Sequence, residues 1–181
     1  MTTNRKDTNG KTLISILSVL LITAAAAVAQ DSEPDPAIQE AKEETAVVYD
    51  LGRFFGYVST LETDTPSLAL SGAQLTDFHD IMAEIQDTER IEPDWAEDTL
   101  EYLELDVLTP KQLMEVDQLA LARTETQESG TGTQRGGGGT GSGPLQTYVA
   151  GGAFNPIIDQ TKSIGQGFFK LFESISGRLN R

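Results

Sequence analysis

The chain has 181 residues, with 28 acidic and 13 basic side chains, a formal net charge of −15 and no cysteine. A negative field of this size repels nucleic acid, so we expect no nucleic-acid partner. The lack of cysteine excludes disulfides, thiolate metal sites and lipid attachment at a lipobox cysteine.

Residues 1–29 have the pattern of a secretory signal peptide. Basic residues precede an apolar run at 13–28, and Ala27 and Ala29 give the small-x-small form of a cleavage site. An uncleaved membrane anchor is the alternative, but the run is shorter than the roughly 20 residues that span a bilayer. We therefore expect an exported protein in the periplasm, the cell envelope or the extracellular space.

Charge and glycine content divide the rest of the chain. Residues 30–129 carry 25 acidic and 5 basic side chains, whereas residues 130–181 carry 2 and 5. The stretch GTGTQRGGGGTGSG, with 8 glycines, is typical of a flexible linker. We expect an acidic leader at 30–35, an acidic helical domain at 36–124, a disordered Gly-rich linker at 125–144 and an amphipathic C-terminal helix at 145–181.

The hydrophobic pattern of the acidic domain is helical throughout. Apolar residues recur at steps of three and four, and no run alternates with period two. Asp35 followed by Pro36 predicts the first helix start. We therefore predict an all-α fold, a small bundle of about four helices that folds without the linker and tail. Its apolar stripes are Val47, Leu51, Phe54, Phe55, Val58 and Leu61; Leu75, Phe78, Met82 and Ile85; Ala96, Leu100, Leu103 and Val107; and Leu113, Val116 and Ala120.

Two short motifs, LSGAQ and LTPKQ, have the sequence of a helix N-terminus. A Ser or Thr at the N-cap accepts a hydrogen bond from a free backbone N–H, and a Gln three residues later reaches back to the cap. We also expect Asp94 to cap a helix, with Glu97 as its partner, in PDWAED. The capping residues predicted for the two motifs are Leu70, Ser71, Gln74, Leu108, Thr109 and Gln112.

The same two motifs carry a resemblance. A Leu-Thr-x-x-Gln pair in a small, exported helical protein resembles the Spy/CpxP family of periplasmic stress proteins, which implies a dimeric helical cradle that shields unfolded clients. Ser71 replaces Thr in one motif, and the acidic core departs from the basic client surface of that family. The order of parts, ending in FNPIID, is also similar to uncharacterised exported bacterial proteins, a likeness that implies no known activity.

The sequence offers no catalytic set, and we predict no catalytic, cofactor-binding or metal-binding residue. His79 is the only histidine, and Asp77 and Asp80 do not share one helix face with it. The acidic stretch at 87–98 lacks the spacing of a calcium loop, and the glycines at 136–139 lack that of a phosphate loop. A metal-dependent enzyme remains an alternative that rests only on the supply of carboxylates.

The C-terminal segment is predicted to be an interaction helix that Asn155 caps and Pro156 starts. Its three candidate surfaces are the acidic core of the same chain, a membrane, or another chain. A homodimer is a further option. We expect a non-enzymatic binding, adaptor or chaperone-like envelope protein; the alternative is a peripheral membrane-associated structural protein acting through this helix. The predicted interaction residues are Ile164, Phe168, Phe169, Leu171, Phe172 and Ile175.

Overall fold

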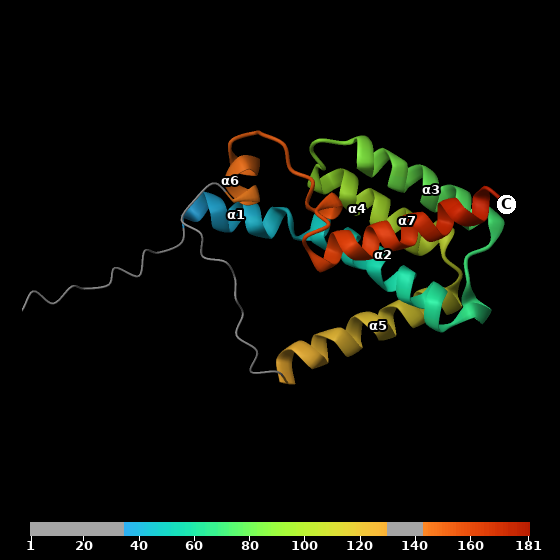
Figure 1. Ribbon diagram of the computed structural model, residues 1–181. Helices are drawn as coiled ribbons and strands as arrows, with labels where there is room; N and C mark the ends of the chain where they lie inside the picture. The colour runs from blue at the N-terminus through green and yellow to red at the C-terminus, as the bar shows by residue number, and fades with distance from the viewer. Residues whose placement is uncertain (1–34, 130–142) are drawn as a thin grey trace, which may run out of the picture. The chain divides into compact units, whose positions relative to one another are not determined.

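The computed structural model describes residues 35–129 and 143–181, and these are helical with no β-strand, which confirms the all-α prediction (Figure 1). The predicted signal peptide, nearly all of the leader and the glycine-rich stretch at 130–142 lie outside the described residues. The α-helices are α1 (Pro36–Glu44), α2 (Ala46–Asp64), α3 (Gly72–Asp87), α4 (Pro93–Tyr102), α5 (Pro110–Ser129), α6 (Pro144–Val149) and α7 (Ser163–Leu179). Short turns are η1 (Pro66–Leu68), the π-turn η2 (Leu103–Val107) and η3 (Pro156–Ile158).

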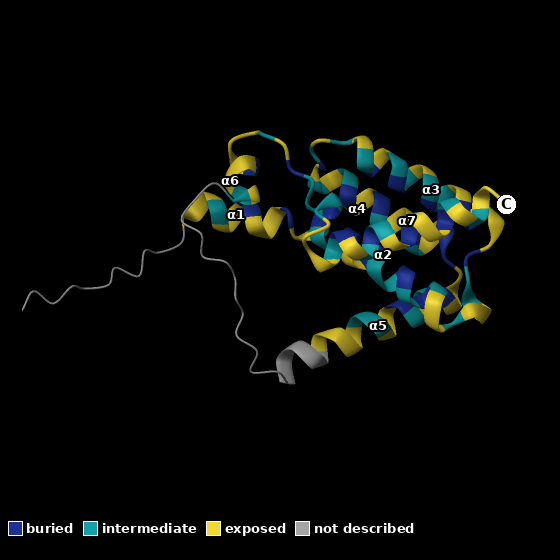
Figure 2. Cartoon of the chain, viewed as in Figure 1, coloured by how far each residue is buried: buried dark blue, intermediate teal, exposed yellow. Residues whose placement is uncertain are grey.

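Helix α2 lies at the centre of the bundle. It contacts α7, α4, α5 and η3, and its buried residues cover a broad side of the helix, whereas Asp50 and Arg53 on the opposite side are exposed (Figure 2). Because a helix packed on several sides must be apolar on each of them, α2 has the broad apolar pattern that its sequence indicates. Its fully buried residues include Leu51, Phe55, Val58 and Leu61.

Helix α7 belongs to the same core, and this differs from the expected division into a domain and a separate tail. The compact unit extends from Pro34 to Arg181. Phe168, Leu171 and Ile175 are completely buried, and the Phe168 ring meets the Phe55 ring edge to face at 5.4 Å. Of the three candidate surfaces for the C-terminal helix, the core of its own chain is the one it contacts.

Glycines let α2 and α7 approach closely. A Cβ atom added at Gly167 would lie 2.9 Å from the Cα of Gly56, which is closer than real Cβ contacts. The two helices run parallel, since Gly52 meets Ile164 near their N-termini and Glu62 meets Arg178 near their C-termini. A glycine in this helix therefore has a packing reason that offsets its low helix propensity.

The first predicted helix is in fact two. Asp35 caps α1 as expected, its carboxylate accepting from the Ala37 N–H at 3.0 Å. The chain then breaks at the buried Thr45, whose hydroxyl donates to the Ala41 carbonyl at 2.7 Å. Helix α1 therefore ends at Glu44, and α2 begins at Ala46 after this single residue.

Two other predicted helix starts are wrong. Asp94 lies inside the first turn of α4, because Pro93 occupies the first helical position and leaves Glu92 at the cap without a side-chain bond. Asn155 and Pro156 open only the short turn η3, and α7 begins at Ser163. The Asn155 amide instead donates to the carbonyls of α3's end, Ile85 and Thr88, at 2.7 and 2.8 Å.

Candidate functional site

The two capping motifs are where the sequence predicts them, and both boxes are complete. The Ser71 N–H donates to Gln74 Oε1 at 2.8 Å, and the Thr109 N–H donates to Gln112 Oε1 at 2.9 Å. The return bonds from the two glutamine N–H groups to the cap hydroxyls are each 3.4 Å. The motifs therefore start α3 and α5 in the same way.

The structure adds a contact between the motifs that the sequence does not indicate. The Gln74 side-chain amide donates to Gln112 Oε1 at 2.7 Å and to the Val107 carbonyl at 2.8 Å. In return, the Gln112 amide donates to the Leu68 carbonyl at 2.9 Å. Both glutamines are buried, so each amide satisfies backbone groups that would otherwise be orphaned. This glutamine pair joins the starts of α3 and α5.

An ion pair ties the end of α7 to the same region. Arg178 pairs with Glu62 of α2, whose side chain is only 7% exposed, and the other oxygen of that carboxylate accepts from the Leu70 N–H. Arg178 also donates to the Leu70 carbonyl at 2.7 Å. Leu70, the first residue of the LSGAQ motif, is thus held by both α2 and α7. The two motifs therefore have a structural role, because they connect the ends of several helices.

The predicted interaction residues of α7 divide into two groups. Phe168, Leu171 and Ile175 are completely buried, while Ile164, Phe169 and Phe172 are half-buried. The Phe172 ring stacks on His79 with ring centres 5.3 Å apart. His79 lies 3.6 Å from Asp80, and the described residues contain no group of three or more His, Asp or Glu side chains placed to hold a metal ion.

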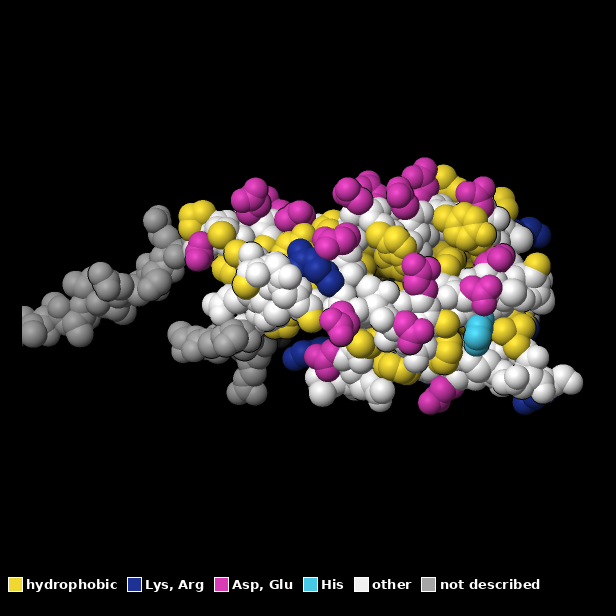
Figure 3. All heavy atoms as spheres, turned by 90° about the horizontal axis from the view of Figure 1, so that it is seen from above, with side chains coloured by type: hydrophobic (Ala, Val, Ile, Leu, Met, Phe, Trp, Pro, Cys, Tyr) yellow, Lys and Arg dark blue, Asp and Glu magenta, His cyan; other side chains and the backbone are white. Residues whose placement is uncertain are grey.

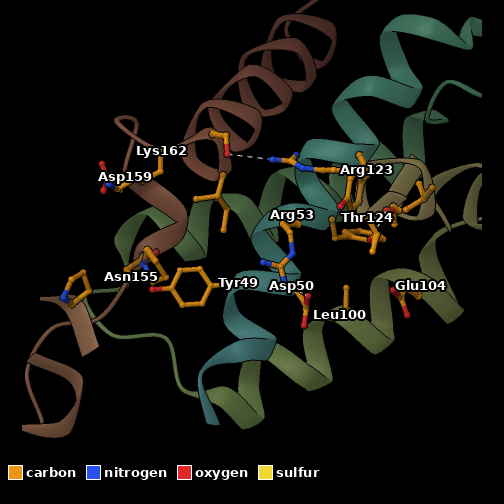
Figure 4. A pocket seen from close by; sticks show the side chains of 18 of the residues that line it. Tyr49, Asp50, Arg53, Leu100, Glu104, Arg123, Thr124, Asn155, Asp159 and Lys162 are labelled. Carbon is orange, nitrogen blue, oxygen red and sulfur yellow. Dashed lines mark hydrogen bonds and ion pairs between the residues drawn. The ribbon is translucent and has the colours of Figure 1, made fainter. Parts of the chain in front are cut away.

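A groove of about 950 Å³ lies beside α5, and we call it the α5 groove (Figure 4). Tyr49, Phe54 and Tyr57 of α2 line it, and α4 with η2, the inner side of α5 and residues 153–164 complete it. At its mouth the Arg123 guanidinium reaches the Ser163 hydroxyl at 3.5 Å, the outer limit for a hydrogen bond.

Charges of both signs surround this apolar floor. Arg53 pairs with Asp50 of its own helix, and Asp159 accepts from the Thr161 hydroxyl at 2.6 Å and from the Thr161 N–H at 3.0 Å. Those bonds hold the pKa of Asp159 below its ordinary value. Burial, and then the charge of Asp117, raise the pKa of Glu104. Within the described ranges no ion pair involves Glu104 of η2 or Asp117 of α5, although Arg53, Arg123 and Lys162 line the same groove.

Helix α5 forms one wall of the groove and leaves the bundle as it proceeds (Figure 1). Gln112 and Val116 are buried, but none of the residues from Asp117 to Thr124 is. Met114 and Leu121, on its outer side, are 60% and 65% exposed. The sequence predicts α5 as an ordinary bundle helix. Its apolar residues lie both on the inner side, as Val116 does, and on the outer side, as Met114 and Leu121 do, and this pattern indicates that the helix packs incompletely on the rest of the bundle.

Acidic side chains are prominent elsewhere on the surface. Figure 3 shows a face on which Asp and Glu side chains are scattered widely, with few Lys or Arg among them and with apolar side chains exposed between. Among the helices of the described residues, none is long and apolar enough to cross a membrane.

Comparisons with known proteins give no relative: no protein-family model, no curated protein and no solved structure matches this chain. The resemblance of the two capping motifs to the Spy/CpxP family, and of the order of parts to uncharacterised exported proteins, stays a prediction.

Proposed function

We propose that the protein is an exported, non-enzymatic binding protein that holds an apolar helical segment of a partner protein in the α5 groove, in an adaptor or chaperone-like role. The observation that carries the proposal is the open groove itself, with an aromatic floor from α2 and a wall, α5, that stands away from the body. Concave, largely apolar surfaces with a few polar groups at the rim are the usual form of binding sites. Export is proposed on the pattern of residues 1–29.

The size of the groove favours a helix as its occupant. An α-helix about 10 Å across rises 5.4 Å in each turn, so one turn fills roughly 420 Å³. The groove volume of about 950 Å³ therefore corresponds to about two turns. An amphipathic helix laid in an apolar groove is a common mode of protein recognition.

The alternative of a peripheral membrane protein acting through α7 has a structural cost. The apolar face of α7 already covers α2, with Phe168, Leu171 and Ile175 completely buried. To reach lipid, the helix would have to leave this core and expose the apolar surface of α2 to water. The proposal therefore rests on the groove and not on α7.

The test is suppression of aggregation. The chain from residue 30, which contains the whole compact unit, is mixed with insulin whose disulfides are then reduced, and light scattering is followed. Because the chain has no cysteine, the reductant leaves it unchanged. We expect scattering to fall as the protein is added in excess. Full aggregation at every ratio would remove the chaperone-like role.

A matched pair of variants locates the activity. Ala120→Arg places a long charged side chain on the groove wall, whereas Leu121→Arg places the same side chain at the neighbouring, outward-facing position, which is 65% exposed. We expect Ala120→Arg to lose the suppression and Leu121→Arg to keep it, with both melting as the parent does. Equal activity of the two variants would show that clients bind elsewhere.

A further inference from the structure

The charged side chains that line the α5 groove are not evenly mixed. Burial and then the charge of Asp117 raise the pKa of Glu104, so these two carboxylates lie near each other. Arg123 follows Asp117 by six residues on α5, a rise of about 9 Å, and donates to Ser163 at the start of α7. Figure 4 shows Glu104 on one side of the groove and Lys162, the neighbour of Ser163, on the other. The groove therefore has an acidic end and a basic end.

The other charged groups of the groove offset one another within the chain. Arg53 pairs with Asp50 of the same helix, so this pair adds no net charge. Lys162 is close enough to Asp159 to help lower the pKa of that carboxyl, after the two hydrogen bonds from Thr161. Once these groups are set against each other, the acidic end keeps two carboxylates and the basic end keeps one guanidinium.

A helix that fills the groove would meet both ends. The groove has room for about two turns, and two residues seven positions apart lie on one face of a helix with a rise of about 10.5 Å between them. This spacing is close to the rise of about 9 Å between Asp117 and Arg123. A base at one of the two positions and an acid at the other would each face an opposite charge. Apolar residues between them would cover the floor of Tyr49, Phe54 and Tyr57.

We propose that the partner segment in the α5 groove is an amphipathic helix with one basic and one acidic side chain two turns apart, at the edge of its apolar stripe. The inference rests on the proposed function, since it names the chemistry of the occupant of the same groove. The base pairs with Asp117 and Glu104, and the acid pairs with Arg123. A helix with two bases or two acids meets a like charge at one end, which selects against it. The helix can enter in either direction, so the groove requires the pair of charges and not their order.

Three synthetic peptides test the pairing. They share one amphipathic helical sequence with a stripe of Leu and Phe, and they differ only at two positions, two turns apart, which carry Lys and Glu, two Lys, or two Glu. Binding to the chain from residue 30 is measured by titration calorimetry in about 0.15 M salt, where exposed charges more than about 8 Å apart are largely screened. We expect the Lys/Glu peptide to bind about fivefold more tightly than either of the others. Equal affinity of the three peptides would overturn the proposal.

Two variants of the protein assign each charge to its end. Asp117→Lys neutralises the acidic end, so it should abolish the discrimination against the Glu/Glu peptide and keep that against the Lys/Lys peptide. Arg123→Gln neutralises the basic end and should have the opposite effect. Glu173→Lys, at an exposed position of α7 outside the groove, changes the net charge as Asp117→Lys does and should leave the three affinities unchanged. If Asp117→Lys and Arg123→Gln altered the three affinities in the same way, the two ends would be wrongly assigned and the proposal would fall.

The charge pairing and the proposed function can fail separately. Suppose that the peptides bind equally or not at all, while the chain protects insulin and loses this protection with Ala120→Arg. The groove would then remain the client site, and the charge pairing would be refuted. Selective binding of the Lys/Glu peptide by a chain that leaves insulin aggregation unchanged would keep the charged helix as the occupant and refute the chaperone-like role.

Discussion

At the scale of single residues, the glutamines of the two motifs do more than complete a capping box. Local sequence is enough to predict the box, because cap and partner are three residues apart. The bonds of Gln74 to Gln112 and Val107 span 38 and 33 residues, so only the packed fold brings those groups together. The motif repeat thus indicated two helix starts, but not that they meet.

Removing one glutamine should cost more than removing a cap. Gln112→Ala leaves the Gln74 amide and the Leu68 carbonyl short of partners in a buried site, so we expect a loss of about 2 kcal/mol in the free energy of unfolding by urea. Thr109→Ala, the capping control, should cost about 1 kcal/mol. Gln74→Ala with Gln112→Ala should cost less than the sum of the two, since the partners vanish together. Additive losses would contradict a shared bond.

The Glu104 carboxyl gives a prediction about pH. Its pKa is raised above the ordinary value of 4.5, first by burial and then by the Asp117 charge. A raised pKa in the folded state means that ionisation opposes folding, and this cost is absent below pH 4.5 and grows as the pH rises through the raised pKa. The Glu104→Gln variant should therefore have a higher melting temperature than the parent at neutral pH and the same melting temperature in acid. The exposed Glu101→Gln is the control, and a pH-independent difference would contradict the account.

At the scale of helices, proline explains the position of several helix starts, but it is not sufficient for one. Asp35 and Thr109 each stand directly before a proline and each bonds as a cap, and the same rule puts the cap of α4 at Glu92 rather than Asp94. Asn155 also precedes a proline, but Asp159 then bonds the Thr161 N–H in a turn and stops the helix. The apolar stripe of α7 was readable from the sequence, whereas the surface that it covers depends on the three-dimensional fold.

Two glycines of α7 should respond in opposite directions to alanine. A Cβ at Gly165 would lie 2.2 Å from the backbone oxygen of Asp159, so Gly165→Ala should lower the stability by about 1–3 kcal/mol. A Cβ at Gly177 meets nothing within 4 Å, so Gly177→Ala should gain up to about 1 kcal/mol from helix propensity. Thermal or urea unfolding of the pair measures both. Stabilisation by both substitutions would mean that α7 does not pack on residue 159.

At the scale of the whole molecule, the core is assembled from distant parts of the chain. Helix α7 runs along α2 more than a hundred residues away, and the Phe55, Phe78 and Phe168 rings form one cluster through Phe55, with ring centres 6.2 and 5.4 Å apart. Composition and charge favoured a division at the glycine-rich stretch, because an acidic and a basic segment flank it. Which apolar face a helix covers is a property of the fold, and that is why the sequence left the partner of α7 open.

This arrangement predicts that the acidic part cannot fold alone. Residues 30–129 lack Phe168, Leu171 and Ile175, and burial of each of these side chains stabilises the fold by about 1.5–3 kcal/mol. The three losses together are comparable to the net stability of a small domain. We expect this fragment to melt without a cooperative transition by circular dichroism. Adding residues 143–181 as a separate peptide should restore the transition, because the α2–α7 contact needs no covalent link. The same peptide with Phe168→Asp should not, since it would bury a charge against Phe55. A fragment that melts cooperatively by itself would show that α7 is an accessory to the core.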